Sequence, residues 1–169
     1  MPQLSLQINT VDPPPPEHGS ARYIIETIRV QLNVAESPPT ERADSSDRAT
    51  AILHRLFANL EPDQEHFLIL GLNTKNAVLS YKLIASGGQA STTIDPKLVF
   101  RHALLMGAAR IILSHSHPSG DPTPSKDDHC ITKRLARTGR DLDLPVIDHI
   151  IIAPPDRSYS FAQSGCMPT

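Results

Sequence analysis

From Ser46 onward, short aliphatic runs of strand length alternate with segments whose apolar residues recur at helical spacing. His66 to Leu72 is a nearly continuous apolar run, and Ala108 to Ser114 and Val146 to Ala153 have the same character. Runs of this kind are typical of strands that are buried on both faces of a sheet, which requires helices on both sides. The alternation therefore predicts an α/β domain in which a mixed β-sheet is flanked by helices.

Helix and turn signals place the other elements between these strands. Serine and aspartate cap helix starts, proline suits the first helical turn, and glycine commonly ends a helix. The expected elements are a helix capped by Ser46 or Asp47 that ends before Pro62, a hairpin of His66–Leu72 with Ala77–Ala85, a helix from Pro96 to about Met106, a strand Ala108–Ser114, a helix from Ser125 to Thr138 closed by Gly139, and a strand Val146–Ala153 followed by a polar tail.

The first 45 residues differ from the rest of the chain. They contain the proline run Pro13 to Pro16 and the linker-like sequence SPPTERADSS. A β-branched stretch from Ile24 to Leu32 is the strand signal in this segment, so we expect at most one strand there. We therefore divide the chain into a proline-rich, partly ordered extension, residues 1–45, and one globular domain, residues 46–169.

Composition narrows the class of protein further. The chain has 169 residues, 39% of them hydrophobic, and a domain of this size buries about 70% of its unfolded surface. A formal net charge of -2 provides no overall cationic field for nucleic acid or anionic membranes. No export signal and no apolar run of membrane-spanning length is recognisable. Cys130 and Cys166 are too few for a disulfide framework, so we expect buried free thiols and a cytoplasmic protein.

The sequence SHSHPSGDPTPSKDD, residues 114–128, carries the clearest chemical signal. His115 and His117 lie two apart at the exit of an aliphatic strand, so their side chains share a face. The glycine and prolines that follow turn the chain, and a helix start can bring Asp128 back as a third ligand. Two nitrogens and one oxygen suit zinc, and three protein ligands leave a fourth position for water, as in catalytic sites. Because zinc lowers the pKa of such a water to about 7, the set predicts hydrolysis.

Each part of this sequence also has a structural explanation. A His-x-His pair alone is usually a pair of surface or turn histidines, and Ser125 with Asp128 forms a helix capping box. A capping role and a catalytic role for Ser125 are compatible, because a hydroxyl accepts one hydrogen bond and donates another. The combination is more specific than its parts, since the loop would bring both histidines and Asp128 to one point.

The spacing from His115 and His117 to Ser125 and Asp128 resembles the JAMM motif of MPN-plus metallopeptidases. HPSGDPTPS and VIDHIII resemble the bacterial RadC branch, and the resemblance covers about residues 46–165. It implies a RadC-like JAB/MPN domain with a cytidine deaminase-like α/β fold. The resemblance places the zinc site at a strand exit and a helix N-terminus.

The resemblance also implies a glutamate on an earlier strand, as general base and acid on the zinc-bound water. Glu65 occupies the matching place and directly abuts an apolar strand, whereas Glu61, the competing candidate, precedes Pro62 in an expected loop. Ser125 is implied to hydrogen-bond the water or the developing oxyanion, a contribution of about 2.7 to 4 kcal/mol in other hydrolases.

The chain departs from the RadC pattern in three places. Ser116 stands where that branch usually has asparagine, and Gly88-Gln89-Ala90 stands where it commonly has Ser-Leu-Asn. We expect no helix-hairpin-helix segment of the kind often found upstream in that branch, and this expectation weakens a DNA-binding assignment. We interpret Asp148 and His149 of VIDHIII as strand-end packing residues or as residues that support the metal ligands from behind.

Other polar residues are given structural interpretations. The basic end of the motif helix is more typical of a solvated face, favoured by the helix dipole, than of a nucleic-acid patch. Three further histidines lack ligand spacing. The residues concerned are Lys133, Arg134, Arg137 and Arg140 on the basic helix end, and the histidines His66, His102 and His129.

Three functions from different classes remain. The first is a zinc metallopeptidase-like hydrolase that attacks a peptide or isopeptide amide with water activated by Glu65, and its partner is a protein or peptide substrate. The second is a RadC-type DNA repair or recombination accessory protein that retains the metal site. The third is a non-catalytic partner-binding module. Near-neutral charge and only 4% aromatic residues favour the enzyme over the second, and an open coordination position disfavours the third.

Overall fold

The computed structural model describes residues 41–87 and 94–168 in full, together with the backbone of residues 5–8 and 28–31. Five strands form one mixed sheet in the order β4 (Val78–Ser86), β3 (His66–Leu72), β5 (Arg110–Ser116), β6 (Val146–Ala153) and β7 (Arg157–Ser160). β3 is antiparallel to both of its neighbours, β5 and β6 are parallel, and β7 is antiparallel to β6.

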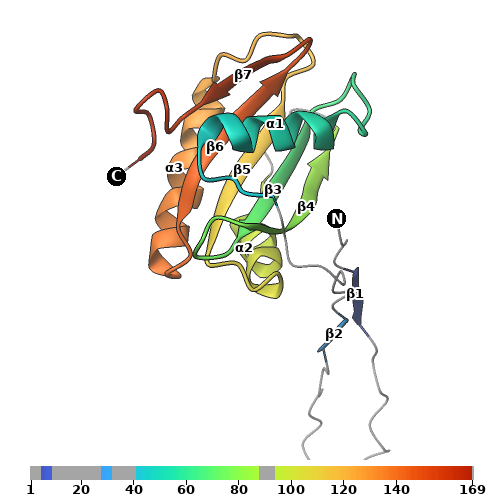
Figure 1. Cartoon of the computed structure of the whole chain (residues 1–169), viewed down its shortest axis with the longest axis vertical. Helices are drawn as coiled ribbons and strands as arrows, with labels where there is room; N and C mark the ends of the chain where they lie inside the picture. Colours follow the sequence, from blue (N-terminus) through green and yellow to red (C-terminus); the bar gives the residue numbers. More distant parts are fainter. Residues whose placement is uncertain (1–4, 9–27, 32–40, 88–93, 169) are drawn as a thin grey trace, which may run out of the picture.

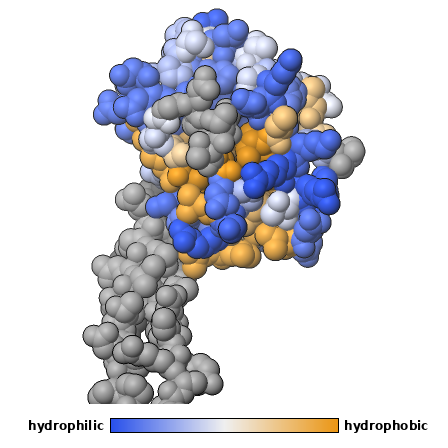
Figure 2. Space-filling model, turned by 180° about the vertical axis from the view of Figure 1, so that it is seen from behind, coloured by the Kyte–Doolittle hydropathy of each residue, from blue (hydrophilic) through white to orange (hydrophobic). Residues whose placement is uncertain are grey.

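Three helices cover the two faces of this sheet. α1 (Ser46–Phe57) crosses one face, and α2 (Pro96–Leu105) and α3 (Lys126–Asp141) lie behind the sheet (Figure 1). Seen from behind, apolar side chains extend from the middle of the face to its lower edge, with groups of polar side chains above and beside them (Figure 2). The expected α/β architecture, a mixed sheet flanked by helices, is therefore confirmed.

β3 supplies both halves of the core because its side chains alternate between the faces. Phe67 and Ile69 pack with residues of α2 and α3, and Leu68 and Leu70 pack with residues of α1. Every residue of β3 is buried, as expected for an interior strand without polar alternation.

Two helix ends differ from the expected ones. The N-cap of α1 is Ser45, whose side chain accepts a hydrogen bond from the Arg48 amide, rather than Ser46 or Asp47. Gly139 lies inside α3 and does not close it. A Cβ at Gly139 would come within 2.6 Å of the Leu144 carbonyl oxygen, so glycine is needed there for close packing and not for a helix stop.

The two ends of the chain also contain more strand than expected. The predicted polar tail after Ala153 includes the edge strand β7. In residues 1–45 the expectation of at most one strand is wrong, because β1 (Ser5–Ile8) and β2 (Ile28–Gln31) pair with each other in antiparallel orientation. Gly88-Gln89-Ala90 lies outside the described residues.

Two surface properties complete the description. Cys130 and Cys166 are free but exposed, so the expected burial of both thiols is wrong. Cys130 follows Asp128 and His129 on the outer face of α3, where a small thiol needs no apolar cover. Within the described ranges, none of the helices combines the length and the apolar surface that a bilayer-spanning helix requires.

Candidate metal centre

The end of β5 and the start of α3 bring His115, His117 and Asp128 together. His115 is the penultimate residue of β5, two positions beyond Leu113 and on the same face, towards α3. His117 follows the strand and is tied to β6 by a hydrogen bond from its amide to the Ile152 carbonyl oxygen, 2.8 Å. One ligand atom from each of the three side chains lies within 4.8 Å of the others.

The loop between His117 and α3 is folded by local hydrogen bonds. The Gly120 amide donates to the His117 carbonyl oxygen over 3.1 Å. Gly120 has φ +81, and a Cβ there would lie 3.2 Å from the Pro154 carbonyl oxygen, so glycine allows the loop to pass close to the β6–β7 turn. This tight passage returns the chain to the N-terminus of α3.

Asp128 is held by the helix capping box that the sequence predicts. The Ser125 hydroxyl accepts from the Asp128 amide at 3.1 Å and donates to Asp128 Oδ2 at 2.6 Å, and the Ser125 amide donates to the same oxygen at 2.7 Å. Asp128 is only 2% exposed, while Ser125 stays at the surface. The cap thus turns the carboxylate inward, with Oδ1 3.0 Å from His115 Nε2.

The hydrogen-bond partners define the protonation of His117. Its Nδ1 lies 2.8 Å from the carbonyl oxygen of Asp121, which can only accept, so Nδ1 carries the proton. In the neutral ring the lone pair is then on Nε2, which points at Asp128 and His115.

A chain of three hydrogen bonds defines which ring nitrogen of His115 carries the proton. The Thr132 hydroxyl donates to the Asp128 carbonyl oxygen at 2.5 Å and therefore accepts from His149 Nδ1 at 2.6 Å. Burial, aided by the charge of His115, keeps the pKa of His149 well below its ordinary value, so His149 is neutral. Its Nε2 accepts from His115 Nδ1 at 2.9 Å, which leaves the His115 lone pair on Nε2.

Three electron-rich atoms consequently face one another. The two Nε2 atoms are 2.9 Å apart, and His117 Nε2 is 3.6 Å from Asp128 Oδ2. A hydrogen bond with Asp128 is the main cause that raises the pKa of His117, against the effect of burial. Burial of Asp128 acts to raise its pKa, yet hydrogen bonds from His115 and His117 hold that pKa well below its usual range. The site therefore favours a positive charge between these atoms, and its donor set fits a metal ion.

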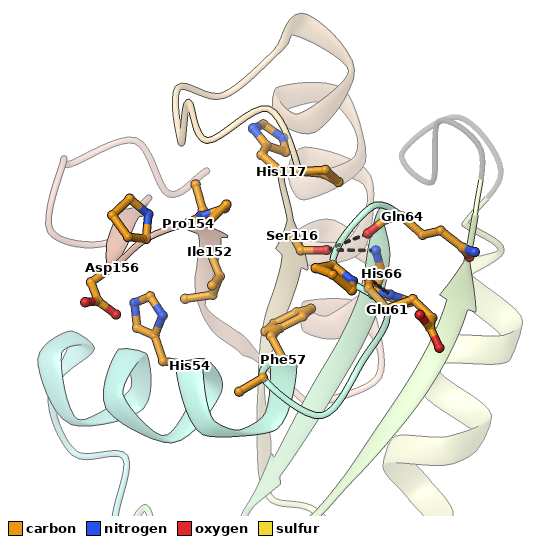
Figure 3. A pocket seen from close by; sticks show the side chains of 15 residues that line it. His54, Phe57, Glu61, Gln64, His66, Ser116, His117, Ile152, Pro154 and Asp156 are labelled. Atoms are coloured by element: carbon orange, nitrogen blue, oxygen red, sulfur yellow. Dashed lines mark hydrogen bonds between the residues drawn. The ribbon is translucent and has the colours of Figure 1, made fainter.

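Glu65 and Glu61 lie on opposite faces of the sheet. Glu65 immediately precedes β3 and, two positions from Phe67, shares the face on which Phe67 stacks with His115. Its charge contributes to raising the pKa of His117. Glu61 instead lines a cavity on the α1 side, and its carbonyl oxygen lies 2.8 Å from His66 Nε2 (Figure 3).

The other polar residues named in the sequence analysis have contacts that explain their positions. His149 lies behind His115, while Asp148 points to the other face and binds Ser46 and Ser160. His129 packs edge-on against Phe161. Thr132 was not recognised from the sequence, because a threonine inside a helix gives no signal of its partners across the core. The other residues are His66, which lines the cavity beside Glu61, His102, which is buried in α2, and the exposed Lys133, Arg134, Arg137 and Arg140 on α3.

The fold and the site together define a class of protein. It is an α/β domain with a candidate metal centre, formed by two histidines at a strand end and an aspartate at a helix start. The family of RadC-like JAB domains matches residues 43–166, and the chain belongs to this family.

Curated relatives agree with that assignment. A UPF0758 protein of Desulforamulus reducens is 50% identical over 90 residues, which are 53% of this chain and 40% of that protein. UPF0758 proteins of Geobacillus sp. and Listeria monocytogenes are 48% and 51% identical over 89 residues, again 53% of this chain and 39% and 40% of theirs. The chain thus matches about two fifths of the length of these relatives.

Proposed function

We propose that this chain is a zinc-dependent hydrolase that cleaves a peptide or isopeptide amide, with His115, His117 and Asp128 as metal ligands. The convergence of the ligand atoms supports this most, because hydrogen bonds hold both Nε2 lone pairs and a carboxylate towards one point. Such a set is costly when buried without a cation. Membership of the JAB family supports the same class of reaction.

Zinc is the metal that this donor set favours. Two imidazole nitrogens and one carboxylate oxygen suit zinc, whereas magnesium and calcium prefer sites made of oxygen alone. When bound with three protein ligands, zinc supplies a Lewis acid that lowers the pKa of a water molecule from about 15.7 to about 7.

Two side chains carry the proton and the charge of the proposed reaction. Glu65, on the His115 face of the sheet, accepts a proton from the attacking water and returns it to the leaving amine nitrogen. The Ser125 hydroxyl, which now donates to Asp128, turns towards the substrate and stabilises the developing oxyanion. Ser125 caps the helix that holds Asp128, and Glu65 immediately precedes β3, which pairs with the strand that holds His115, so one rigid framework positions both.

A RadC-type DNA repair accessory role is the second candidate. The four exposed cations of α3, Lys133, Arg134, Arg137 and Arg140, favour it as a short basic stripe. The formal net charge of -2 disfavours it.

The test combines metal content, turnover and DNA binding on the purified full chain. We expect about one zinc per chain and hydrolysis of quenched fluorescent peptide or lysine isopeptide libraries that stops on chelation and returns with zinc. A chain that binds zinc but cleaves no member of either library would contradict the hydrolase. Micromolar or tighter DNA affinity that weakens with salt would move the second candidate ahead.

A further inference from the structure

A cavity of about 230 Å³ lies on the α1 face of the sheet, close to the candidate metal centre. Phe57 at the end of α1 and Ile152 of β6 lie in its middle, with His117 above them (Figure 3). His117 is the shared wall, because its Nε2 faces Asp128 while the residue also lines the cavity. A group in this cavity can therefore contact a residue that also borders the candidate metal centre.

The cavity has an apolar middle and an acidic character. Apolar side chains and prolines make up most of its lining. Among the described lining residues the carboxylates are Glu61 and Asp156, at opposite ends, no lysine or arginine is present, and the histidines are His54, His66 and His117. Both carboxylates are exposed enough to remain hydrated until a ligand arrives.

Two polar side chains of the lining, His66 and Ser116, already have partners. His66 Nε2 lies 2.8 Å from the Glu61 carbonyl oxygen and Nδ1 lies 2.8 Å from the Ser86 hydroxyl. The Ser116 hydroxyl accepts from the His66 amide at 3.0 Å and donates to the Gln64 carbonyl oxygen at 3.3 Å. Glu61 and Asp156 are the acidic groups of the lining with which a cationic ligand would pair.

We propose that this cavity is a subsite for a lysine or arginine side chain next to the scissile amide of a peptide substrate. The methylene groups of such a side chain cover the apolar middle, and its cationic head reaches Glu61 or Asp156. The loop from Glu61 to Glu65 connects this recognition to catalysis, because it lines the cavity at one end and presents the proposed base at the other. This inference rests on the proposed hydrolase and names the class of its substrate.

The binding test needs no turnover. Amide chemical shifts of the full chain are followed by NMR during titration with Nα-acetylarginine amide, or with Nα-acetylcitrulline amide, which has the same shape without the charge. We expect saturable shifts at Gln64, Ser116 and His117 with arginine. The dissociation constant for citrulline should be about 1.5-fold to fivefold higher, the range of a partly exposed charge pair.

Charge variants locate the effect. The double variant Glu61→Gln with Asp156→Asn should remove the preference for arginine. Asp63→Asn with Asp143→Asn removes the same net charge from exposed positions outside the cavity lining and should keep the preference. Equal binding of the two amides, shifts that map elsewhere, or loss of preference in the second double variant would each overturn the proposal.

A failure of this subsite and a failure of the hydrolase give different results. Arginine binding in the cavity by a chain that cleaves no peptide contradicts the hydrolase alone. Cleavage with equal kcat/KM for peptides carrying arginine or citrulline beside the scissile bond contradicts the subsite alone.

Discussion

Asp148 and His149 are neighbours on β6, but their side chains point to opposite faces of the sheet. Each belongs to a different polar network. The Asp148 carboxylate accepts hydrogen bonds from the hydroxyls of Ser46 and Ser160, at 2.8 and 2.7 Å, and from the amides of His149 and Ala162, at 2.7 and 3.0 Å. Four donors meet the four lone-pair positions of one carboxylate, so this network is complete within the chain.

The network that starts at His149 ends differently. It passes through His115 and reaches two imidazole Nε2 atoms and a carboxylate, and when both rings are neutral neither Nε2 carries a hydrogen. Both networks are buried and both join a helix to the sheet. The two networks differ in the number of hydrogen-bond donors. The Asp148 network has a donor for each acceptor and stabilises the fold, whereas the His149 network has too few donors and favours a bound cation.

Replacing a ligand should have the largest effect. His115→Ala, His117→Ala and Asp128→Ala should each lower zinc affinity by roughly a hundredfold or more, since zinc-finger peptides bind their ion with about 10 to 16 kcal/mol shared among only a few ligands. His129→Ala, an exposed neighbour in α3, is the matched control and should keep the metal. Metal analysis of the purified variants checks this, and unchanged zinc in all three ligand variants would remove the distinction between the two networks.

Glu65→Gln should separate catalysis from metal binding. Glutamine keeps the shape but cannot carry the proton, so we expect full zinc content, unchanged stability and a kcat lower by about two to four orders of magnitude. Asp63→Asn in the same loop is the control. Glu61→Gln should alter KM for basic substrates and leave kcat nearly unchanged. If Glu61→Gln abolishes kcat while Glu65→Gln does not, the assignment of the base is wrong.

Asp148→Ala should affect stability and leave the metal centre intact. It removes the acceptor of four hydrogen bonds, and we expect a loss of about 3 kcal/mol or more in the free energy of unfolding, because hydrogen bonds to charged groups contribute about 1.5 to 3 kcal/mol each. Chemical denaturation measures this loss, and zinc titration should give an affinity within about twofold of the original. A large drop in zinc affinity would show that the two networks are coupled through β6.

Thr132→Val should have the smallest effect, and it acts on the other network. The substitution keeps the shape but removes the hydroxyl between His149 and Asp128, so the orientation of His115 is less well fixed. We expect zinc affinity to fall by about ten- to a hundredfold, as for other residues that orient metal ligands. Thr138→Val removes a similar hydroxyl-to-carbonyl bond near the end of the same helix, at 3.0 Å, and should leave zinc affinity unchanged. Equal affinities of the two variants would contradict a positioning role.

The strands and the three residues of the candidate metal centre were accessible from sequence because their signals are local. β6 matches the predicted strand Val146–Ala153, and β5 begins and ends two residues later than predicted. The spacing of His115, His117 and Asp128 foretold which side chains meet, although the roles assigned to them stay predictions. The local sequence pattern was sufficient to predict these strands, because a strand buried on both faces has a continuous aliphatic run.

The missed features depend on contacts between distant segments. Gly139 looked like a helix stop, but its lack of a side chain serves the approach of Leu144. β7 is a short, largely exposed edge strand whose partner, β6, defines it. Thr132 matters only because His149 lies against it in the folded chain. None of these contacts leaves a trace in periodicity or composition.

The capping box of α3 fixes the side-chain conformation of Asp128, a candidate ligand, before any ion binds. Asp128 Oδ2 accepts hydrogen bonds from the amide and the hydroxyl of Ser125, while Oδ1 faces His115. One oxygen therefore caps the helix, and the other is oriented towards the candidate metal centre. The rotamer of Asp128 is therefore selected when the helix forms, and the entropy of fixing that side chain is lost during folding and not during ion capture. An arriving cation meets a preorganised carboxylate, and the first turn of α3 should exchange its amide hydrogens more slowly once that cation is held.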